Sequence, residues 1–404
     1  MKRLERATYM TQRRAGSGDP AYKPVGRVPS RGGTSNAVSK RSFMHQKSDG
    51  MNYAPKGQAK AVCAPGEFRF AAIGLDHGHI YGECNGLIEA GGELTWVFDP
   101  DPKKVEQFCR TYPGVRAARA EQEILEDAGV QLVCSACVPC ARGPLGVRVM
   151  DHGKDCFTDK PPFTSIEALE AARRKSAETG RIFAVYYAER LHVEAAVHAG
   201  RLIEDGAIGH VVQVLGLGPH RLNAPSRPPW FWDPEQYGGI LVDLGSHQIE
   251  QFLHYASAHE ASVLHSKVGN YNCPEHPAFE DFGDATLLAD TGATFYFRVD
   301  WFTPAGLGSW GDGRTIIVGT DGYIELRKYL DIARDSEGDH VYLVDQRGEH
   351  HLAVHGKVGF PYFGRLIRDC LDRTQTAMTQ RHTFLAAELA LRTQAQALRV
   401  GPSG

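Results

Sequence analysis

The stretch Phe68-Arg-Phe-Ala-Ala-Ile73-Gly74-Leu75-Asp76-His77-Gly78-His79 decides the fold. Its first six residues are typical of a β-strand, and the glycine-containing turn after them leads into a helical pattern that runs to Ala90. Gly91 and Gly92 then end the helix. A strand, a glycine turn and a helix in this order are typical of the first unit of a nucleotide-binding α/β domain.

The same alternation continues along the chain. We expect strands at residues 94–98, 130–136 and 181–187, and helices at residues 103–111, 145–152 and 165–179. Strands that alternate with helices at this spacing predict a doubly wound parallel sheet, which is the Rossmann arrangement.

From about residue 191 the pattern changes. After a helix at 193–205 we expect strands at 211–217, 285–289, 293–301, 314–319, 323–326 and 340–344, and a last helix at 382–398. Strands in succession without helices between them predict a mostly antiparallel sheet. The predicted fold class is therefore α/β, with an N-terminal Rossmann domain at 67–190 and a C-terminal α+β domain at 191–399.

Residues 1–66 differ from the rest in composition. The first 60 residues carry thirteen Lys and Arg against three acidic residues, so their net charge is +10 and that of the remainder is −13. Because few large apolar residues occur there, we expect a disordered basic tail. The acidic body and the lack of interleaved aromatic residues disfavour nucleic-acid binding. An over-long gene start before Met44 or Met51 is an alternative explanation of the tail.

Nine cysteines occur in the chain, and three of them, Cys134, Cys137 and Cys140, have a metal-like spacing. They lie in a buried-strand pattern, however, where residues three apart point to opposite faces. We therefore expect reduced thiols in a cytoplasmic protein. No apolar run approaches the length of a transmembrane helix, so no membrane contact is expected.

The turn after the first strand is an irregular dinucleotide-binding motif. Against G-x-G-x-x-G, Gly74 matches, whereas Asp76 and His79 occupy the second and third glycine positions. Asp99, at the end of the second strand, suits ribose hydroxyls and would repel a 2′-phosphate, which favours NAD over NADP. Asp76, His77 and His79 also allow a metal cluster, but histidines near a cofactor turn more often hydrogen-bond locally, so we expect no metal.

A second informative stretch is Gly238-Gly239-Ile-Leu-Val-Asp243-Leu-Gly-Ser-His247-Gln-Ile-Glu250. Its apolar run predicts a helix, on which Asp243 and His247, four residues apart, share a face. A carboxylate beside an imidazole gives a proton acceptor with a pKa near neutrality and a group that orients it. The alternative is a helix N-terminus with an acid near its dipole and a histidine packed in the core.

Three motifs in order resemble one family of oxidoreductases. They are Asp159-Lys160-Pro161, Asp205-Gly-Ala-Ile-Gly-His210 and Gly238-Gly239-x-x-x-Asp243-x-x-x-His247. Together they resemble the glucose-fructose oxidoreductase / inositol dehydrogenase / rhizopine catabolism (Gfo/Idh/MocA) family over residues 67–399, although Asp159 replaces the family's glutamate. The resemblance implies an N-terminal Rossmann domain and a C-terminal open sheet through which many members associate. It also implies NAD(P)-dependent oxidation or reduction of a sugar, cyclitol or related polyol.

The resemblance assigns a role to each of three residues. Lys160 would lie near the nicotinamide and hydrogen-bond the reacting hydroxyl, His247 would be the general base, and Asp243 would position the substrate or the histidine. Hydride leaves a carbinol carbon readily only as the hydroxyl proton is removed, so a positioned base is needed. A nearby lysine stabilises the developing alkoxide.

Further site residues are expected on the turn and on the loop before the Gly238 helix. The cofactor-binding set is Gly74, Leu75, Asp76, His77, Gly78, His79, Asp99, Pro139, Asp159 and Lys160. His220, Arg221 and Trp230 are expected to contact the substrate, because sugars stack on aromatic rings and bond to Arg and His. Packing within the loop is the alternative for the tryptophan. Arg190 and His192 are expected to face the same cleft.

The predicted function is NAD-dependent hydride transfer, with NADP the less favoured cofactor. The predicted partners are a sugar or polyol substrate and, through the C-terminal sheet, further copies of the chain. Two alternatives use the same fold: a nucleotide-sensing binding protein without catalysis, and a glycosidase that uses bound NAD transiently. Fold alone does not choose between them.

Overall fold

The computed structural model describes residues 50, 53–55, 57, 60–334 and 336–401. Residues 1–49, 51–52, 56 and 58–59, which make up most of the predicted basic tail, lie outside the described residues. Within the described part, no helix combines the length and the apolar character that crossing a membrane requires.

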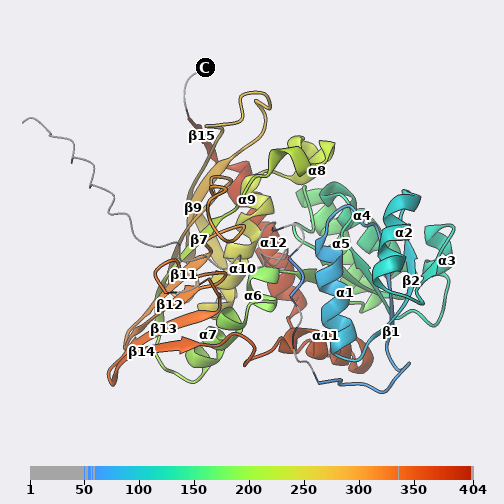
Figure 1. Cartoon of the computed structure of the whole chain (residues 1–404), viewed down its shortest axis with the longest axis horizontal. Helices are drawn as coiled ribbons and strands as arrows, with labels where there is room; N and C mark the ends of the chain where they lie inside the picture. The colour runs from blue at the N-terminus through green and yellow to red at the C-terminus, as the bar shows by residue number, and fades with distance from the viewer. Residues whose placement is uncertain (1–49, 51–52, 56, 58–59, 335, 402–404) are drawn as a thin grey trace, which may run out of the picture. The chain divides into compact units, whose positions relative to one another are not determined.

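A six-stranded parallel sheet forms the first half of the chain (Figure 1). Its strands are β1 (Arg69–Ile73), β2 (Glu93–Phe98), β3 (Arg116–Ala117), β4 (Leu132–Ser135), β5 (Asp155–Asp159) and β6 (Phe183–Tyr186). Their order is β3-β2-β1-β4-β5-β6, so the direction of winding reverses between β1 and β4. Ligands of such sheets bind at the carboxyl ends of the strands beside this reversal. The predicted doubly wound parallel sheet is confirmed.

The helices between these strands begin and end at residues that are typical of helix termini. They are α1 (His79–Glu89), α2 (Pro102–Thr111), α3 (Glu121–Leu125), α4 (Pro139–Asp151) and α5 (Ile166–Thr179). The Ser165 side chain accepts the Ala168 N–H at the start of α5, and Gly180 ends it at φ +64°. Helix α4 begins six residues earlier than the predicted residue 145, because Pro139 fits the first turn of a helix, where its missing N–H costs nothing.

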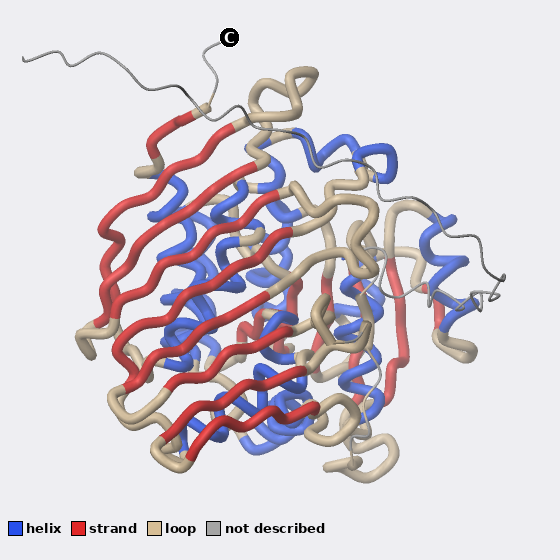
Figure 2. Tube along the Cα trace, turned by 60° about the vertical axis from the view of Figure 1, so that its left-hand side comes forward, coloured by secondary structure: helices blue, strands red, loops and turns tan. Residues whose placement is uncertain are grey.

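A nine-stranded sheet forms the second half (Figure 2). Its strands are β7 (Val211–Pro219), β8 (Ala261–Gly269), β9 (Phe282–Ala289), β10 (Thr294–Asp300), β11 (Arg314–Gly319), β12 (Tyr323–Arg327), β13 (His340–Asp345), β14 (Gly348–Ala353) and β15 (Leu398–Val400). Their order is β14-β13-β12-β11-β7-β10-β9-β8-β15, and only the pairs β7–β10 and β8–β15 are parallel. The prediction of a large, mostly antiparallel sheet is confirmed. The predicted last helix is wrong at its end, because residues 398–400 pair with β8 instead.

Most helices of the second half lie between the two sheets, whereas α11 (Pro361–Asp372) packs on α1 of the first half (Figure 1). They also include α6 (Ala188–Leu191), α7 (Glu194–Glu204), α8 (Pro234–Tyr237), α9 (Ile240–Asp243), α10 (Gly245–Tyr255) and α12 (Gln380–Ala395). Helix α10 approaches β7 closely because Gly216 and Gly218 have no side chains. A Cβ at either position would lie within 2.8 Å of the Gln248 side chain.

Helix α12 contacts both halves of the molecule. It packs on β8 and α10 on one side and on α5 and β6 on the other. At its first residue, Gln380 accepts the Phe183 N–H at 2.9 Å and donates to the Phe183 carbonyl at 3.2 Å. One side-chain amide therefore satisfies both backbone groups of Phe183 at the free edge of β6, as a neighbouring strand would.

Candidate active site

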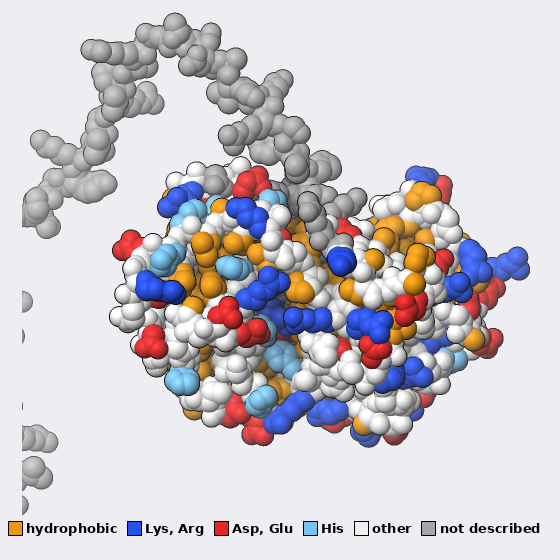
Figure 3. All heavy atoms as spheres, turned by 90° about the horizontal axis from the view of Figure 1, so that it is seen from below, with side chains coloured by type: hydrophobic (Ala, Val, Ile, Leu, Met, Phe, Trp, Pro, Cys, Tyr) orange, Lys and Arg blue, Asp and Glu red, His pale blue; other side chains and the backbone are white. Residues whose placement is uncertain are grey.

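The candidate site is a cleft between the carboxyl ends of the parallel strands and the helices of the second half. Its lining includes the predicted residues His77, His79, Pro139, Lys160, His220, Arg221, Trp230, Asp243 and His247. Residues that are far apart in the sequence therefore meet here. The face of the molecule drawn in Figure 3 carries acidic, basic and histidine side chains interspersed with apolar ones.

The turn after β1 retains the geometry of a dinucleotide-binding turn. Gly74 has φ +79°, and a Cβ there would lie 2.5 Å from the Cβ of Cys137, so glycine is required. Gly78 precedes the first turn of α1, which carries no acidic residue. The Asp76 carboxylate binds Lys104 Nζ at 2.5 Å and the Val138 N–H at 3.1 Å. Its negative charge is therefore offset, and the turn is compatible with a pyrophosphate.

Asp99 lies at the end of β2, beside this turn. Its two carboxylate oxygens accept the N–H groups of Leu75 at 2.7 Å and Asp101 at 2.8 Å, and Lys104 Nζ lies 3.8 Å away. These bonds fix the carboxylate next to the turn. Lys104 was not predicted, because a lysine in the first turn of a surface helix has no distinguishing sequence feature.

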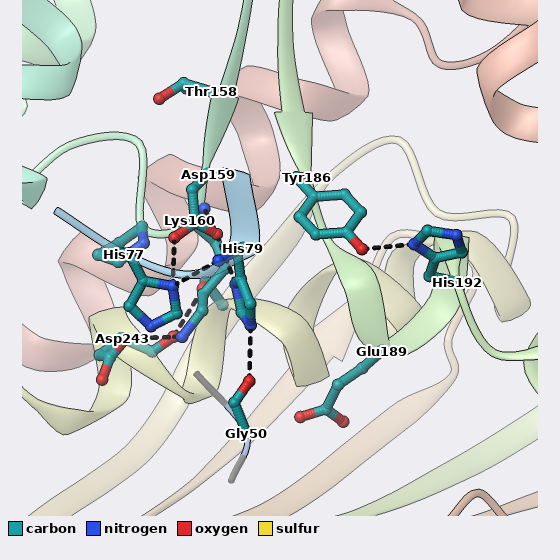
Figure 4. Close-up of polar contacts among 12 residues, drawn as sticks. Gly50, His77, His79, Thr158, Asp159, Lys160, Tyr186, Glu189, His192 and Asp243 are labelled. Carbon is teal, nitrogen blue, oxygen red and sulfur yellow. Dashed lines mark hydrogen bonds and ion pairs between the residues drawn. The ribbon is translucent and has the colours of Figure 1, made fainter. Parts of the chain in front are cut away.

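Asp159 is the centre of a buried polar cluster (Figure 4). His79 Nδ1 lies 2.8 Å from its Oδ1 and His77 Nδ1 lies 3.3 Å from its Oδ2. The guanidinium of the buried Arg142 donates to Oδ2 at 3.0 Å, and the Lys160 N–H donates to Oδ1 at 2.8 Å. Burial raises the pKa of Asp159, but His79, Arg142 and His77 outweigh it and hold the pKa well below its usual range. The carboxylate is therefore ionised.

Arg142 was missed by sequence reasoning. It lies in the first turn of α4 and also donates to the carbonyls of Cys137 at 2.7 Å and Pro161 at 3.1 Å. It therefore fixes the loop that presents Lys160, and the Lys160–Pro161 peptide within that loop is cis. Its position just after a parallel strand was the available clue, since such positions face the ligand crevice.

Lys160 and Asp243 form an ion pair across the cleft. Lys160 Nζ donates to Asp243 Oδ1 at 2.7 Å and to the Asp243 carbonyl at 3.3 Å, and the lysine side chain is only 6% exposed. Asp243 therefore pairs with the lysine. Helix α9 ends at Asp243 and α10 begins at Gly245, but Leu244 between them keeps helical backbone angles (φ −90°, ψ −36°), so the expected helix is present as two adjoining pieces.

His247 is buried at the start of α10. Its Nδ1 has no hydrogen-bond partner among the described residues. Burial lowers the pKa of His247 well below its usual value, aided by Lys160 and opposed by Glu189. The ring is therefore a neutral imidazole at pH 7, which is the form that accepts a proton.

Glu189 is a second buried acid that the sequence did not single out. Its Oε2 accepts from Lys328 Nζ at 2.9 Å and from Gln248 Nε2 at 2.8 Å, and its Oε1 lies 3.9 Å from His220 Nε2. Burial raises the pKa of Glu189, but Lys328, His247 and His220 outweigh it, so the net shift is downward. It follows β6 directly, at the carboxyl end of the parallel sheet.

The loop after β7 supplies the wall of the cleft. The His220 ring lies against Trp310 and Trp301, with ring centroids 4.4 and 5.5 Å apart. Arg221 donates to the carbonyls of Leu307 at 2.6 Å and Ser309 at 2.8 Å, so its guanidinium holds a neighbouring loop while it lines the cleft. Trp230 lines the cleft and is half-buried.

The buried His220 makes stability depend on pH. Burial lowers the pKa of His220 to about 4, against the opposing effect of Glu189. The unfolded chain, with a pKa near 6.5, takes up the proton first as the pH falls. This contribution to the free energy of unfolding is therefore complete above pH 6.5 and decreases towards pH 4, by on the order of 2 kcal/mol between pH 6.5 and 5. We expect Tm to fall less steeply over this range in His220→Gln than in the unmodified chain.

The exposed His210 provides the matched control for this measurement. His210→Gln is expected to leave the slope of Tm against pH unchanged. An equal slope in His220→Gln and the unmodified chain would show that His220 does not carry the effect.

Two predicted residues lie elsewhere. Arg190 forms a bidentate ion pair with the buried Glu250, and the Tyr186 hydroxyl lies 2.5 Å from His192 Nδ1. Neither residue lines the cleft. The expectation that they face it is wrong, because helix α6 turns Arg190 towards α10.

Two residues of the predicted tail reach the cleft. Gly50 accepts from His79 Nε2 at 3.1 Å (Figure 4), and Tyr53 packs against Tyr329 and Trp310 with ring centroids 5.6 and 6.0 Å apart. Both line the cleft. Their basic, polar sequence surroundings gave no indication of this contact.

Two family models match the chain. Residues 68–187 match the oxidoreductase family with an NAD-binding Rossmann fold, Gfo/Idh/MocA, and residues 197–325 match the Gfo/Idh/MocA C-terminal domain. The two matches cover the parallel sheet and the first part of the large sheet in turn.

Individual relatives agree with these matches. A scyllo-inositol 2-dehydrogenase (NAD+) of Bacillus subtilis (strain 168) is 28% identical over 265 residues, which are 64% of this chain and 73% of that protein. A solved structure from Erwinia carotovora atroseptica SCRI1043 is 49% identical, with a TM-score of 0.80, and the match covers 83% of this chain and 100% of that one. One from Thermotoga maritima, 20% identical, shares the fold with a TM-score of 0.71 over 82% of this chain and 98% of that one.

Proposed function

Because the chain belongs to the Gfo/Idh/MocA family of oxidoreductases, we propose that it transfers a hydride between NAD and a carbinol carbon of a sugar, cyclitol or related polyol. The observation that carries this proposal is the meeting of Lys160, Asp243 and the neutral His247 in one cleft beside the dinucleotide-binding turn. The cyclitol relative named above supports the substrate class.

The cofactor would be held by the turn after β1 and the ends of the neighbouring strands. Gly74, Leu75, Gly78 and the N-terminus of α1 would face the pyrophosphate, and Asp99 the ribose. The remaining members of the proposed cofactor set are Asp76, His77, His79, Pro139, Asp159 and Lys160. Bound NAD supplies the hydride acceptor, and every other requirement of the reaction falls on the protein.

The protein side of the reaction needs a base, a cation and a means of orientation. His247 would take the hydroxyl proton as the hydride leaves, and Lys160 would hold the developing alkoxide. Asp243, which binds Lys160 Nζ at 2.7 Å, would keep that group aimed into the cleft. His220, Arg221 and Trp230 would contact the rest of the substrate.

We further propose that residues 67–190 bind the nucleotide and that residues 191–399 bind the substrate and associate with further copies of the chain. The outer face of the large sheet supports association, because it exposes the apolar side chains of Val212, Leu264 and Tyr323. Absence of nucleic-acid binding stays a prediction. All nine cysteines are free, which supports a cytoplasmic location.

Titration with NAD(H) and NADP(H), followed by tryptophan fluorescence, tests the proposal first. Trp230, Trp301 and Trp310 line the cleft, so quenching reports its occupancy. We expect NAD(H) to quench at lower concentration than NADP(H), and a screen of polyols and glycosides with NAD to give NADH. Absence of quenching by both nucleotides would replace this proposal by that of a binding protein without catalysis.

Asp99 is expected to set the nucleotide preference. In Asp99→Ser the repulsion of a 2′-phosphate is removed, so the ratio of the Kd values for NADP and NAD should fall by about tenfold or more. Asp101→Ser, two residues away at the start of α2, retains a helix-capping side chain and is the matched control. An unchanged ratio in Asp99→Ser would remove Asp99 from the ribose site.

A further inference from the structure

We propose that His77, His79 and Asp159 bind a divalent transition-metal ion in the wall of the cleft. One donor atom from each residue lies within 4.8 Å of the other two. His79 Nδ1 lies 2.8 Å from Asp159 Oδ1 and His77 Nδ1 lies 3.3 Å from Asp159 Oδ2, so small shifts of these atoms would let them surround a cation at roughly 2.1 Å from each. Figure 4 shows the three side chains converging, His77 from the turn after β1, His79 from the start of α1 and Asp159 from the end of β5.

The hydrogen bonds of His79 determine which of its nitrogens carries a proton. Its Nε2 lies 3.1 Å from the Gly50 carbonyl oxygen, which only accepts, so Nε2 must be the donor. In the neutral ring, Nδ1 then presents a lone pair to Asp159 Oδ1 at 2.8 Å. Two lone pairs at this distance repel each other, unless a cation or a second proton lies between them.

His77 presents a lone pair in the same direction. Its Nδ1 accepts the backbone N–H of His79 at 3.2 Å, at the long limit of a hydrogen bond, and lies 3.3 Å from Asp159 Oδ2. A nitrogen that accepts an N–H carries no proton of its own. A metal bound at Nδ1 would replace this long hydrogen bond and relieve the repulsion from the carboxylate.

The outer contacts of the cluster are those of a metal site. Metal-binding histidines commonly donate their other N–H to a backbone carbonyl, and metal-binding carboxylates are themselves hydrogen-bonded. Gly50 fulfils the first condition for His79, while Arg142 at 3.0 Å and the Lys160 N–H at 2.8 Å fulfil the second for Asp159. These contacts fix the donor atoms before any ion binds.

Two imidazoles and one carboxylate suit Zn²⁺, Co²⁺ or Fe²⁺ better than Mg²⁺ or Ca²⁺, which prefer oxygen donors. Three protein donors leave at least one coordination position for a water molecule or a substrate oxygen. His77 and His79 line the same cleft as His247 and Lys160, so that position is available to a ligand of the cleft. The metal site stands apart from the proposed hydride transfer, since ion binding is measured without turnover.

A proton is the competing occupant. Protonation of His79 would give an imidazolium that donates to Asp159, and the nearby Arg142 guanidinium would repel a dication. Titration of the full-length chain with Co²⁺, after treatment with EDTA and dialysis, distinguishes the two. We expect a visible d–d absorption band that saturates at one Co²⁺ per chain, and one Zn²⁺ per chain by elemental analysis after loading with zinc.

Variants locate the bound ion. His79→Ala and His77→Gln should each weaken Co²⁺ binding by about 100-fold, since each loses a ligand, whereas loss of a supporting contact alone costs 10–100-fold. His77 lies on a loop, so His77→Gln keeps the test valid if the more buried His79 variant fails to fold. His355→Ala serves as the matched control, because Glu194, Asp339 and His355 form another possible metal-binding group among the described residues.

Two results would overturn the proposal. One is the lack of a Co²⁺ band at one equivalent, which would leave the proton as the occupant. The other is loss of the band in His355→Ala with retention in His77→Gln, which would place the ion at the Glu194 cluster.

Discussion

His247→Ala is expected to lower kcat for NAD-linked polyol oxidation by about 10²–10⁴-fold, the usual contribution of a general base. The imidazole is the neutral base in the cleft, and alanine offers no atom that could take the hydroxyl proton. Because burial holds the pKa of His247 well below 6.5, activity of the unmodified protein should stay flat from pH 8 to 6.5 and fall only at lower pH. Steady-state kinetics across this range checks both expectations.

The controls separate catalysis from folding. Tm and the Kd for NADH of His247→Ala should stay near those of the unmodified protein, because the base is not part of the nucleotide turn. His152→Ala, at an exposed position on the end of α4, should leave kcat unchanged. A kcat for His247→Ala within threefold of the unmodified value would show that His247 is not the general base. Lys160→Ala is expected to lose most of the turnover as well, and survival of activity in both variants would sink the dehydrogenase assignment.

Arg142→Met is expected to cost about 3–5 kcal/mol of stability, the range for removal of one partner of a buried ion pair. The guanidinium is 1% exposed and Asp159 is fully buried, so the carboxylate would lose the Arg142 guanidinium without gaining access to water. The carbonyls of Cys137 and Pro161 would also lose their donor. Urea unfolding and Tm measure the effect.

The same substitution six residues along α4 is the matched control. Arg148 pairs with Glu121 at 2.8 Å, but its side chain is half-exposed, and such pairs contribute about 1 kcal/mol or less. Arg148→Met should therefore change Tm little. Equal losses of stability in the two variants would mean that the buried cluster around Asp159 contributes no more to the stability of the fold than an exposed ion pair does.

The sequence predicted the parts of this architecture that depend on local pattern. Alternating strands and helices defined the parallel sheet, and the change of pattern near residue 191 defined the start of the second, mostly antiparallel sheet. Two of the three motifs that carry the resemblance meet in one cleft, where Lys160 contacts Asp243 from 83 residues away, whereas no residue of the motif at 205–210 lines that cleft. Lys160 directly follows β5 at the carboxyl edge of the parallel sheet, but Asp243 lies on α9 of the second half, so the resemblance and not strand order brought these two residues together.

The contacts between individual side chains could not be predicted from the sequence pattern. Spacing of four residues placed Asp243 and His247 on one face, and both line the cleft, but it gave no indication that the Asp243 carboxylate would bind Lys160. Glu189 and Arg142 derive their importance from burial, and burial of a charged residue depends on segments that lie far away in the sequence. Gly50 and Tyr53 reach the cleft from a stretch without any regular pattern.

The Gln380 side chain, which binds both backbone groups of Phe183, has a consequence for synthesis of the chain. Until residue 380 leaves the ribosome, the last strand of the nucleotide-binding sheet presents an open edge, and such edges recruit other strands. Almost two hundred residues separate the edge from the amide that covers it. The parallel sheet is therefore translated first, but its edge at β6 is covered only after α12 has been made. A nascent chain stopped before α12 would be prone to aggregation at β6.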